Sequence, residues 1–406
     1  MCSRNLKLLS LELIFLSLSI AFDKTSSRVD PDAFRNVSQI IRSKGYPVEE
    51  YSVQTTDGYI LGVQHIPYGR KFSQSSKFIK TFSSKRTIFL QHGLLSSSTD
   101  WVINSPTESL GFILADAGYD VWLGNFRGNT YSRKHIKYST HSKEFWEFSF
   151  DEMALLDLPA MIDFVLNKTG KNQLLYVGHS QGTLTAFALL SEKTEYNKKV
   201  KTLFALAPVA TVGYIKSPIK YLAPYTNDIE MLFKLLGINE FLPNTKFIKF
   251  LGDLVCSTEI RIFCEQVIFL FAGVDPKQIN ATRLPVYISH NPAGTSTQNI
   301  VHFAQLVNSK KLVKYNYGKI KNMELYNQTD PPEYLLEKIT APVALFWAQD
   351  DWLADVVDIA LLQPRLKHLR KSYLVNYTMW SHLDFIWGID APKYVYKELL
   401  KVLEKY

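Results

Sequence analysis

The segment of this chain best suited to chemistry is residues 178–182, which read Gly-His-Ser-Gln-Gly. A serine hydroxyl is a weak nucleophile, so it must project from a strained turn toward a base, and a glycine on each side leaves room for the crowded backbone. The apolar run 174–177 precedes the segment and a helical pattern over 183–190 follows it. Because strand, tight turn and helix are the context that this motif requires, the pattern predicts Ser180 as a catalytic nucleophile.

A nucleophilic serine needs a histidine base, and the base needs a carboxylate that orients it. The apolar run 342–348 leads directly to Asp350 and Asp351, and Asp351 is the predicted acid, with Asp350 as the alternative. A third carboxylate, Asp355, lies one helical turn into the next segment, a position more typical of an N-terminal cap. His382 follows the last predicted strand and is the predicted base, because serine, acid and histidine occur in this order along such chains.

Negative charge that develops on a substrate oxygen needs preorganised donors. The backbone N–H of Gln181, directly after the nucleophile, is the first predicted donor. His92 and Gly93 follow the apolar run 88–91, and this turn gives the N–H of Leu94 as the second donor. We interpret His92 as a residue that shapes the turn. Together these residues predict a serine esterase that forms an acyl-enzyme, and this chemistry requires neither a cofactor nor a metal ion.

The elements that must position these residues read as a mostly parallel sheet. Two β-rich runs are joined through Asp57 and Gly58, a strong hairpin signal. Short apolar runs then alternate with helical patterns, which is typical of parallel strands connected by crossover helices. These runs cover residues 87–91, 119–123, 173–177 and 201–207. One intervening helix has apolar residues at helical spacing between 153 and 165, and Gly170 supplies its stop.

The pattern changes after Pro208, where a long stretch to about Lys338 has mixed helical segments and no clear strand alternation. We interpret it as an insertion. The predicted fold is an α/β-hydrolase, with a mostly parallel central sheet flanked by helices and an inserted, mainly helical cap and lid. The expected boundaries are a core over 26–210, the cap and lid over 211–339, and the rest of the core over 340–406.

Composition and charge exclude several classes of protein. The chain has 406 residues, 46% of them hydrophobic, which excludes a disordered or fibrous protein. Its formal net charge of +8 is spread along the chain without a basic run interleaved with aromatic residues, so nucleic-acid binding is not expected.

The first residues have the features of a targeting segment. Arg4 and Lys7 precede an apolar stretch, and Ser19 and Ala21 offer a small-residue cleavage pattern, so residues 1–21 are predicted to be a signal peptide. The stretch is short and contains Glu12, which argues against a transmembrane segment. The protein is therefore expected to be secreted, with the lysosomal lumen as the alternative.

A secreted chain exposes Asn-X-Ser/Thr triplets to glycosylation, and five are present. The predicted sites are Asn36, Asn167, Asn280 and Asn327. Asn376 is predicted to be unused, because it falls in an expected buried strand over residues 373–377. Of the three cysteines, Cys2 leaves with the signal peptide, and an oxidising compartment favours a bridge between Cys256 and Cys264. Two buried free thiols are the alternative, since spacing alone does not bring two side chains together.

Seven segments together resemble the acid lipase family of animals, the gastric and lysosomal acid lipases. The similarity extends over nearly the whole mature chain. The segments are residues 49–51, 57–61, 90–95, 125–129, 178–183, 290–295 and 382–385.

The resemblance implies hydrolysis of triacylglycerols, and in some members cholesteryl esters, at acidic pH, beneath a cap and lid. It supports Asp351, because residues 351–355 match the second half of the family pattern around the acid, whereas Ala-Gln-Asp at 348–350 replaces the glycines expected in the first half. The pair Cys256 and Cys264 is similar to a cysteine pair in the family's cap. The expected partner is a neutral lipid ester at a lipid–water interface.

Two other functions remain open from the sequence. A carboxylesterase for smaller soluble esters would use the same residues. A catalytically silent lipid-binding homologue would retain the pocket, and the unusual turn at Asp350 and Asp351 is its sequence support.

Overall fold

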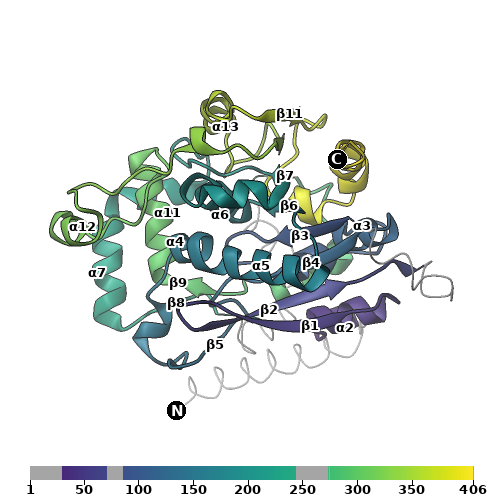
Figure 1. Ribbon diagram of the computed structural model, residues 1–406, viewed down its shortest axis with the longest axis horizontal. Helices are drawn as coiled ribbons and strands as arrows, with labels where there is room; N and C mark the ends of the chain where they lie inside the picture. Colours follow the sequence, from purple (N-terminus) through teal and green to yellow (C-terminus); the bar gives the residue numbers. More distant parts are fainter. Residues whose placement is uncertain (1–29, 71–85, 244–272, 274, 406) are drawn as a thin grey trace, which may run out of the picture.

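The computed structural model describes residues 30–70, 86–243, 273 and 275–405 (Figure 1). The predicted signal peptide over residues 1–21, Cys256 and Cys264 lie outside the described residues, as do residues 244–272 of the predicted cap. Across the described ranges, no helix has the length and apolar character needed to cross a bilayer.

A nine-stranded sheet forms the centre of the described structure. Its strands are β1 (Glu49–Gln54), β2 (Tyr59–Ile66), β3 (Thr87–Gln91), β4 (Asp120–Gly124), β5 (Lys134–His135), β6 (Leu174–His179), β7 (Val200–Leu206), β10 (Val343–Trp347) and β11 (Leu369–Leu374). They are arranged in the order β1-β2-β4-β3-β6-β7-β10-β11, with β5 paired to β2. The β1, β2 and β5 pairings are antiparallel, and every pairing from β4 to β11 is parallel.

The central strands are buried along their whole length. All five residues of β3 and all six of β6 are buried. Parallel strands covered by helices on both faces read as continuous apolar runs, which is why the sequence located them well. The carboxyl ends of such strands meet at one edge of the sheet, where ligands bind in open α/β folds.

Helices cover the sheet and build the inserted segment. They are α2 (Val37–Ser43), α3 (Leu110–Asp116), α4 (Phe150–Glu152), α5 (Leu158–Thr169), α6 (Gln181–Glu192), α7 (Thr226–Leu236), α10 (Leu284–His290), α11 (Thr297–Ser309), α12 (Lys319–Tyr326), α13 (Val356–Leu362), α14 (Asp384–Trp387) and α15 (Lys397–Leu403). Figure 1 shows α4, α5 and α6 in front of the sheet, and α7, α11 and α12 gathered at the left end.

The helix α5 illustrates how local sequence defines an element. Leu158, Met161, Ile162 and Val165 repeat at helical spacing and are buried against the sheet. The helix stops at Gly170, which takes a left-handed conformation with φ 65° that glycine adopts without strain. In the described part of the 211–339 insertion, helices alternate with irregular segments, and the strand pairings are the short antiparallel pair β8 (Glu240–Phe241) with β9 (Thr295–Ser296) and an isolated bridge between Val313 and Glu333.

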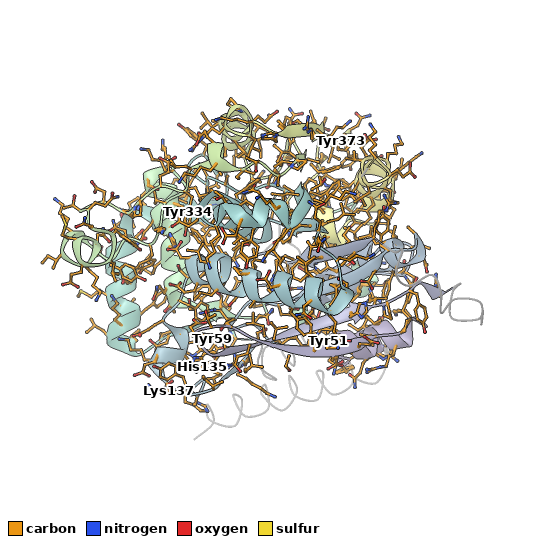
Figure 2. All side chains as sticks on the ribbon, in the orientation of Figure 1. Tyr51, Tyr59, His135, Lys137, Tyr334 and Tyr373 are labelled. Atoms are coloured by element: carbon orange, nitrogen blue, oxygen red, sulfur yellow. The ribbon has the colours of Figure 1, made fainter. Side chains whose placement is uncertain are left out.

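The last strand differs from the prediction. It spans Leu369–Leu374, not 373–377, and its residues alternate between half-buried and exposed. As the edge strand it pairs only with β10, and Tyr373 lies at the upper border of the molecule (Figure 2). Asn376 follows in a bend and is exposed, so the burial argument against this glycosylation site is wrong. An edge strand lacks the continuous apolar run that marks central strands, and the sequence therefore misplaced it.

We expect Asn376 to carry an N-linked oligosaccharide when the protein passes through the secretory pathway of an animal cell. Both Asn376 and Thr378 of its acceptor triplet are exposed, which gives the transferase access. Deglycosylation with a peptide amidase in ¹⁸O-labelled water followed by peptide mass spectrometry would detect the labelled aspartate at this position. An unmodified Asn376 in a preparation modified at Asn36 and Asn167 would contradict the expectation.

Candidate active site

Ser180 occupies a sharp turn between β6 and α6. Its φ is 52° and its ψ is −120°, a combination that side-chain-bearing residues rarely adopt. The backbone packs closely around this turn, and the two flanking glycines leave the space that this packing needs. A Cβ placed on Gly178 would lie 2.7 Å from the Gly182 carbonyl, and one placed on Gly182 would lie 2.3 Å from the carbonyl oxygen of Gln91. The two glycines therefore let the strand, the turn and β3 approach one another.

Asp351 and His382 form a buried pair beyond the end of β10. His382 Nδ1 lies 2.9 Å from each carboxylate oxygen of Asp351, which is 0% exposed. The same carboxylate accepts the backbone N–H groups of Leu353 at 2.9 Å and Ala354 at 2.7 Å. Burial alone would raise the pKa of Asp351, but His382 and these two amides outweigh it and hold the pKa below its ordinary value. Asp351 is therefore an anion that accepts the Nδ1 proton and directs Nε2 outward.

The neighbouring carboxylates have other partners. Asp350 accepts a hydrogen bond from the indole Nε1 of Trp352 at 3.1 Å. Asp355 accepts the N–H of Val357 at 2.8 Å as the N-cap of α13, and its carboxylate lies 3.0 Å from Lys216 Nζ. The structure therefore pairs His382 with Asp351 of the candidates that the sequence left open, and it gives Asp355 the capping position expected of it.

The loop that carries His382 lies against the serine turn. The side chain of His179, the residue before Ser180, lies with its Nε2 3.0 Å from the carbonyl oxygen of His382. The two imidazole rings have centroids 5.0 Å apart. With Nδ1 of His382 directed at Asp351, Nε2 is the ring nitrogen left to accept a proton from a hydroxyl.

The loop after β3 packs on the other side of the serine. A Cβ on Gly93 would lie 3.1 Å from the Cβ of Ser180, a contact tighter than most Cβ contacts, so glycine favours this close approach. Leu94 follows directly, and Gln181 is the first residue of α6, where a helix leaves its N–H without an intrahelical acceptor. Both predicted amide donors thus belong to segments that meet at Ser180.

His92 shapes this loop. Its Nδ1 donates to the carbonyl of Gly93 at 2.8 Å, and its Nε2 accepts from the Phe126 N–H at 3.2 Å and from Asn129 Nδ2 at 3.0 Å. Burial lowers the pKa of His92 to about 4, so the ring is neutral at ordinary pH. These contacts match the interpretation of His92 as a structural residue.

Comparisons with known proteins decide the family. Residues 37–105 match the partial alpha/beta-hydrolase lipase region, and residues 86–389, well over half of the chain, match the alpha/beta hydrolase fold. The gastric triacylglycerol lipase of Rattus norvegicus is 49% identical over 92% of this chain and 93% of that protein. The lysosomal acid lipase/cholesteryl ester hydrolase of Homo sapiens is 46% identical over 93% of each chain.

This chain belongs to the acid lipase family of α/β-hydrolases. It is therefore a lipase, a serine ester hydrolase, and the resemblance seen in the sequence is confirmed. A solved structure of a lipase candidate from Sulfolobus solfataricus superposes with a TM-score of 0.56 at 15% identity, covering 88% of this chain and 99% of that one. At this identity the superposition supports the fold alone.

The sequence analysis did not predict a buried ionic cluster around Arg127. Arg127 is 1% exposed; its Nη1 lies 2.7 Å from Asp57 and its Nε lies 2.8 Å from Asp157. Its guanidinium also lies 4.0 Å from the ring centre of Tyr59, which Figure 2 labels beside His135. Burial opposes the charge on Arg127, but the two carboxylates outweigh it and raise the pKa. The cluster joins the β1–β2 turn to the loop after β4, a connection that sequence spacing alone does not show.

Asp384 is a second residue that the sequence analysis did not single out. It is 2% exposed, and its Oδ2 accepts the N–H of Ser381, the residue before His382, at 2.6 Å. Burial, its largest influence, raises the pKa of Asp384 to about 8. The group is thus a neutral acid at neutral pH that holds the histidine loop through a backbone bond.

This shift predicts a pH dependence of stability. A carboxyl whose folded pKa is raised binds its proton more tightly when folded, so its contribution is complete below about pH 4 and is lost as the pH rises through about 8. Asparagine keeps the acceptor oxygen but does not titrate. We therefore expect Asp384→Asn to reduce the fall of the unfolding free energy with pH by up to about 1.4 kcal/mol per pH unit. Chemical denaturation of both proteins between pH 4 and 8 would measure it, and parallel curves would refute the expectation.

Metal ligands do not gather in the described part of the chain, where His, Cys, Asp and Glu nowhere form a group of three that could hold an ion. The structure pairs His382 with Asp351, and the hydrogen bond from His179 brings the loop that carries His382 to the turn that carries Ser180.

Proposed function

We propose that this lipase hydrolyses fatty-acyl esters of neutral lipids, with Ser180 as nucleophile, His382 as base and Asp351 as orienting acid. Triacylglycerols are the main proposed substrates, and cholesteryl esters are a second class. The observation that carries the proposal is the buried Asp351–His382 pair, 2.9 Å between nitrogen and oxygen, on a loop that packs against the strained Ser180 turn.

The proposed mechanism follows from these roles. His382 Nε2 takes the proton of the Ser180 hydroxyl as its oxygen attacks the ester carbonyl, and the amides of Leu94 and Gln181 stabilise the resulting oxyanion. The imidazolium then gives its proton to the departing alcohol, which leaves the fatty-acyl group on Ser180. Water, activated by the same imidazole, releases the fatty acid and restores the hydroxyl.

A lipid substrate is supported by the names of the relatives, a triacylglycerol lipase and a lysosomal acid lipase/cholesteryl ester hydrolase. It is also supported by exposed apolar residues of the insertion over 211–339, the proposed cap and lid. They lie on the 3₁₀ helix Pro218–Tyr225 and on α7: Tyr221, Leu222, Tyr225, Met231, Leu232, Leu235 and Leu236. A concentrated apolar surface of this kind suits contact with a lipid droplet.

The proposed route of the protein is the secretory pathway, ending outside the cell or in the lysosomal lumen. The signal-like residues 1–21 and the exposed positions of Asn36, Asn167 and Asn327 are consistent with it, with Asn280 half-buried. In that compartment a Cys256–Cys264 bridge is proposed. The two core segments, 26–210 and 340–406, supply the triad together.

Comparison of substrates tests the proposal. Purified glycosylated protein would be assayed at acidic and neutral pH on emulsified long-chain triacylglycerol, emulsified cholesteryl ester and a water-soluble short-chain ester. A lipase turns over the emulsions, whereas activity confined to the soluble ester would favour a carboxylesterase. A serine-directed phosphonate should label Ser180, and failure to label it would favour a silent lipid-binding protein.

A further inference from the structure

We propose that His179 is a positioning residue that sets the geometry between the nucleophile and the base of this lipase, an inference that rests on the proposed triad. His179 is the last residue of β6 and directly precedes Ser180. Its Nε2–H donates to the carbonyl oxygen of His382 at 3.0 Å, across 203 positions of sequence. One hydrogen bond therefore joins the strand that ends in the nucleophile to the loop that carries the base.

The ring of His179 is held between two parts of the site. It is 4% exposed, and its centroid lies 5.0 Å from that of His382. On another side, a Cβ added to Gly93 would come within 3.2 Å of His179 Nδ1, so the ring lies against the loop that supplies the Leu94 amide. The His179 side chain thus contacts the loop that carries His382 and the loop that carries Leu94, while its backbone continues into Ser180.

The other contacts of the loop that carries His382 show what the hydrogen bond from His179 adds. Asp351 fixes the rotation of the His382 ring through Nδ1, and Asp384 holds the preceding residue, Ser381, through its N–H. Neither contact relates the loop to the turn that carries Ser180. The bond from His179 does, because the donor is one residue from the nucleophile and the acceptor belongs to the base itself.

The chemical state of His179 suits this role. Burial lowers its pKa to about 3, and the nearby charge of His382 lowers it further in the same direction. The ring therefore stays neutral across the working pH range and keeps a single proton for the bond. A cation at this position would oppose the imidazolium that forms on His382 during each half of the reaction.

Three substitutions separate donation from packing. Phenylalanine keeps an aromatic ring and removes the donor. Glutamine carries its amide at about the distance of the imidazole Nε2, whereas asparagine carries it near the position of Nδ1, too short to reach the His382 carbonyl. Since misplacement of about 1 Å at a reacting centre costs roughly 10²-fold in rate, we expect His179→Phe and His179→Asn to lower kcat by ~10- to 100-fold. His179→Gln should recover kcat to within roughly threefold of wild type, because it restores the donor.

A matched control is available elsewhere in the chain. His302 on α11 is also fully buried; its Nε2 lies 3.0 Å from the carbonyl oxygen of Val313, and burial lowers its pKa to about 3. Its ring stacks on Phe150. Among the described residues, its contacts include neither the loop that carries His382 nor the turn that carries Ser180. His302→Phe removes the same kind of bond, so it should lower the melting temperature while leaving kcat near that of wild type.

The experiment measures kcat, KM and melting temperature of these variants on a water-soluble ester, where interfacial binding does not contribute. The inference predicts a fall in kcat with unchanged KM for Phe and Asn, recovery with Gln, and a stability effect alone for His302→Phe. If Phe is poorly folded, the Gln and Asn pair decides. A folded Asn or Phe variant with kcat within twofold of wild type, or a Gln variant as slow as Asn at equal stability, would overturn it. An inactive wild type, or an active Ser180→Ala, would overturn the proposed triad instead.

Discussion

Ser180→Ala is expected to lower kcat by about 10⁶-fold on every ester substrate while leaving the fold intact. The hydroxyl oxygen forms the acyl bond in the proposed mechanism, and no rearrangement of His382 or Asp351 supplies another. Activity left in the variant would come from the amides of Leu94 and Gln181 and from substrate binding. Assays with a long-chain emulsion and a soluble ester, with melting temperature measured in parallel, would give both quantities. Since alanine also has a Cβ, it meets the same positive φ and relieves none of the strain of the turn.

The helix that follows Ser180, α6, provides a control for the Ser180→Ala variant. Ser191, near the other end of α6, is buried and donates its hydroxyl to the carbonyl of Ala188 at 3.0 Å. Ser191→Ala removes a comparable hydroxyl far from the turn, and we expect normal kcat with a small loss of stability. If both alanine variants were equally active, Ser180 would have no place in the mechanism.

The sequence predicted the parts of the lipase that depend on local patterns. The strand β3 spans Thr87–Gln91, as expected, because a strand buried on both faces leaves a continuous apolar run. The Ser180 turn was found for a similar reason, since the glycines around it are required by contacts within a few residues and with β3. By contrast β11, with an alternating pattern at the edge of the sheet, was placed about four residues late.

Contacts between distant segments could not be read from the sequence. His179 is interior to the motif that identified Ser180, yet its bond to His382 depends on how two loops meet after the fold has closed. The Arg127 cluster likewise joins residues that are 70 and 30 positions apart. A fully buried arginine is costly unless carboxylates pair with it. The arginine in segment 125–129 was therefore the available signal, and it called for acidic partners from elsewhere in the chain.

The choice between Asp350 and Asp351 shows the same limit. The two residues are adjacent after a strand, and their types are identical, so sequence gives no physical reason to prefer one. In the structure the two side chains differ in their contacts, because the chain turns after Asp351 and aims the amides of Leu353 and Ala354 at its carboxylate. The side chain of Asp350 turns instead to Trp352.

This difference makes Asp351→Asn the second large expected effect, a fall in kcat of about 10⁴-fold with the fold retained. The amide oxygen of asparagine would keep the N–H groups of Leu353 and Ala354, which leaves its NH₂ group facing His382 Nδ1. Nδ1 must then accept, so the ring proton moves to Nε2, which can no longer take the proton of Ser180. Measurement of kcat on the soluble ester, with melting temperature as the check on folding, would detect the loss.

Asp350→Asn is the matched control, because it makes the same chemical change one residue away. Its amide oxygen can still accept from the Trp352 indole, so we expect kcat to stay within about twofold of wild type. The reverse result, an inactive Asp350 variant beside an active Asp351 variant, would transfer the acid role to Asp350. It would also require the loop to change conformation in solution, since His382 Nδ1 lies 2.9 Å from both oxygens of Asp351 here. The pair of variants therefore tests the assignment of the acid and the geometry of this turn in one experiment.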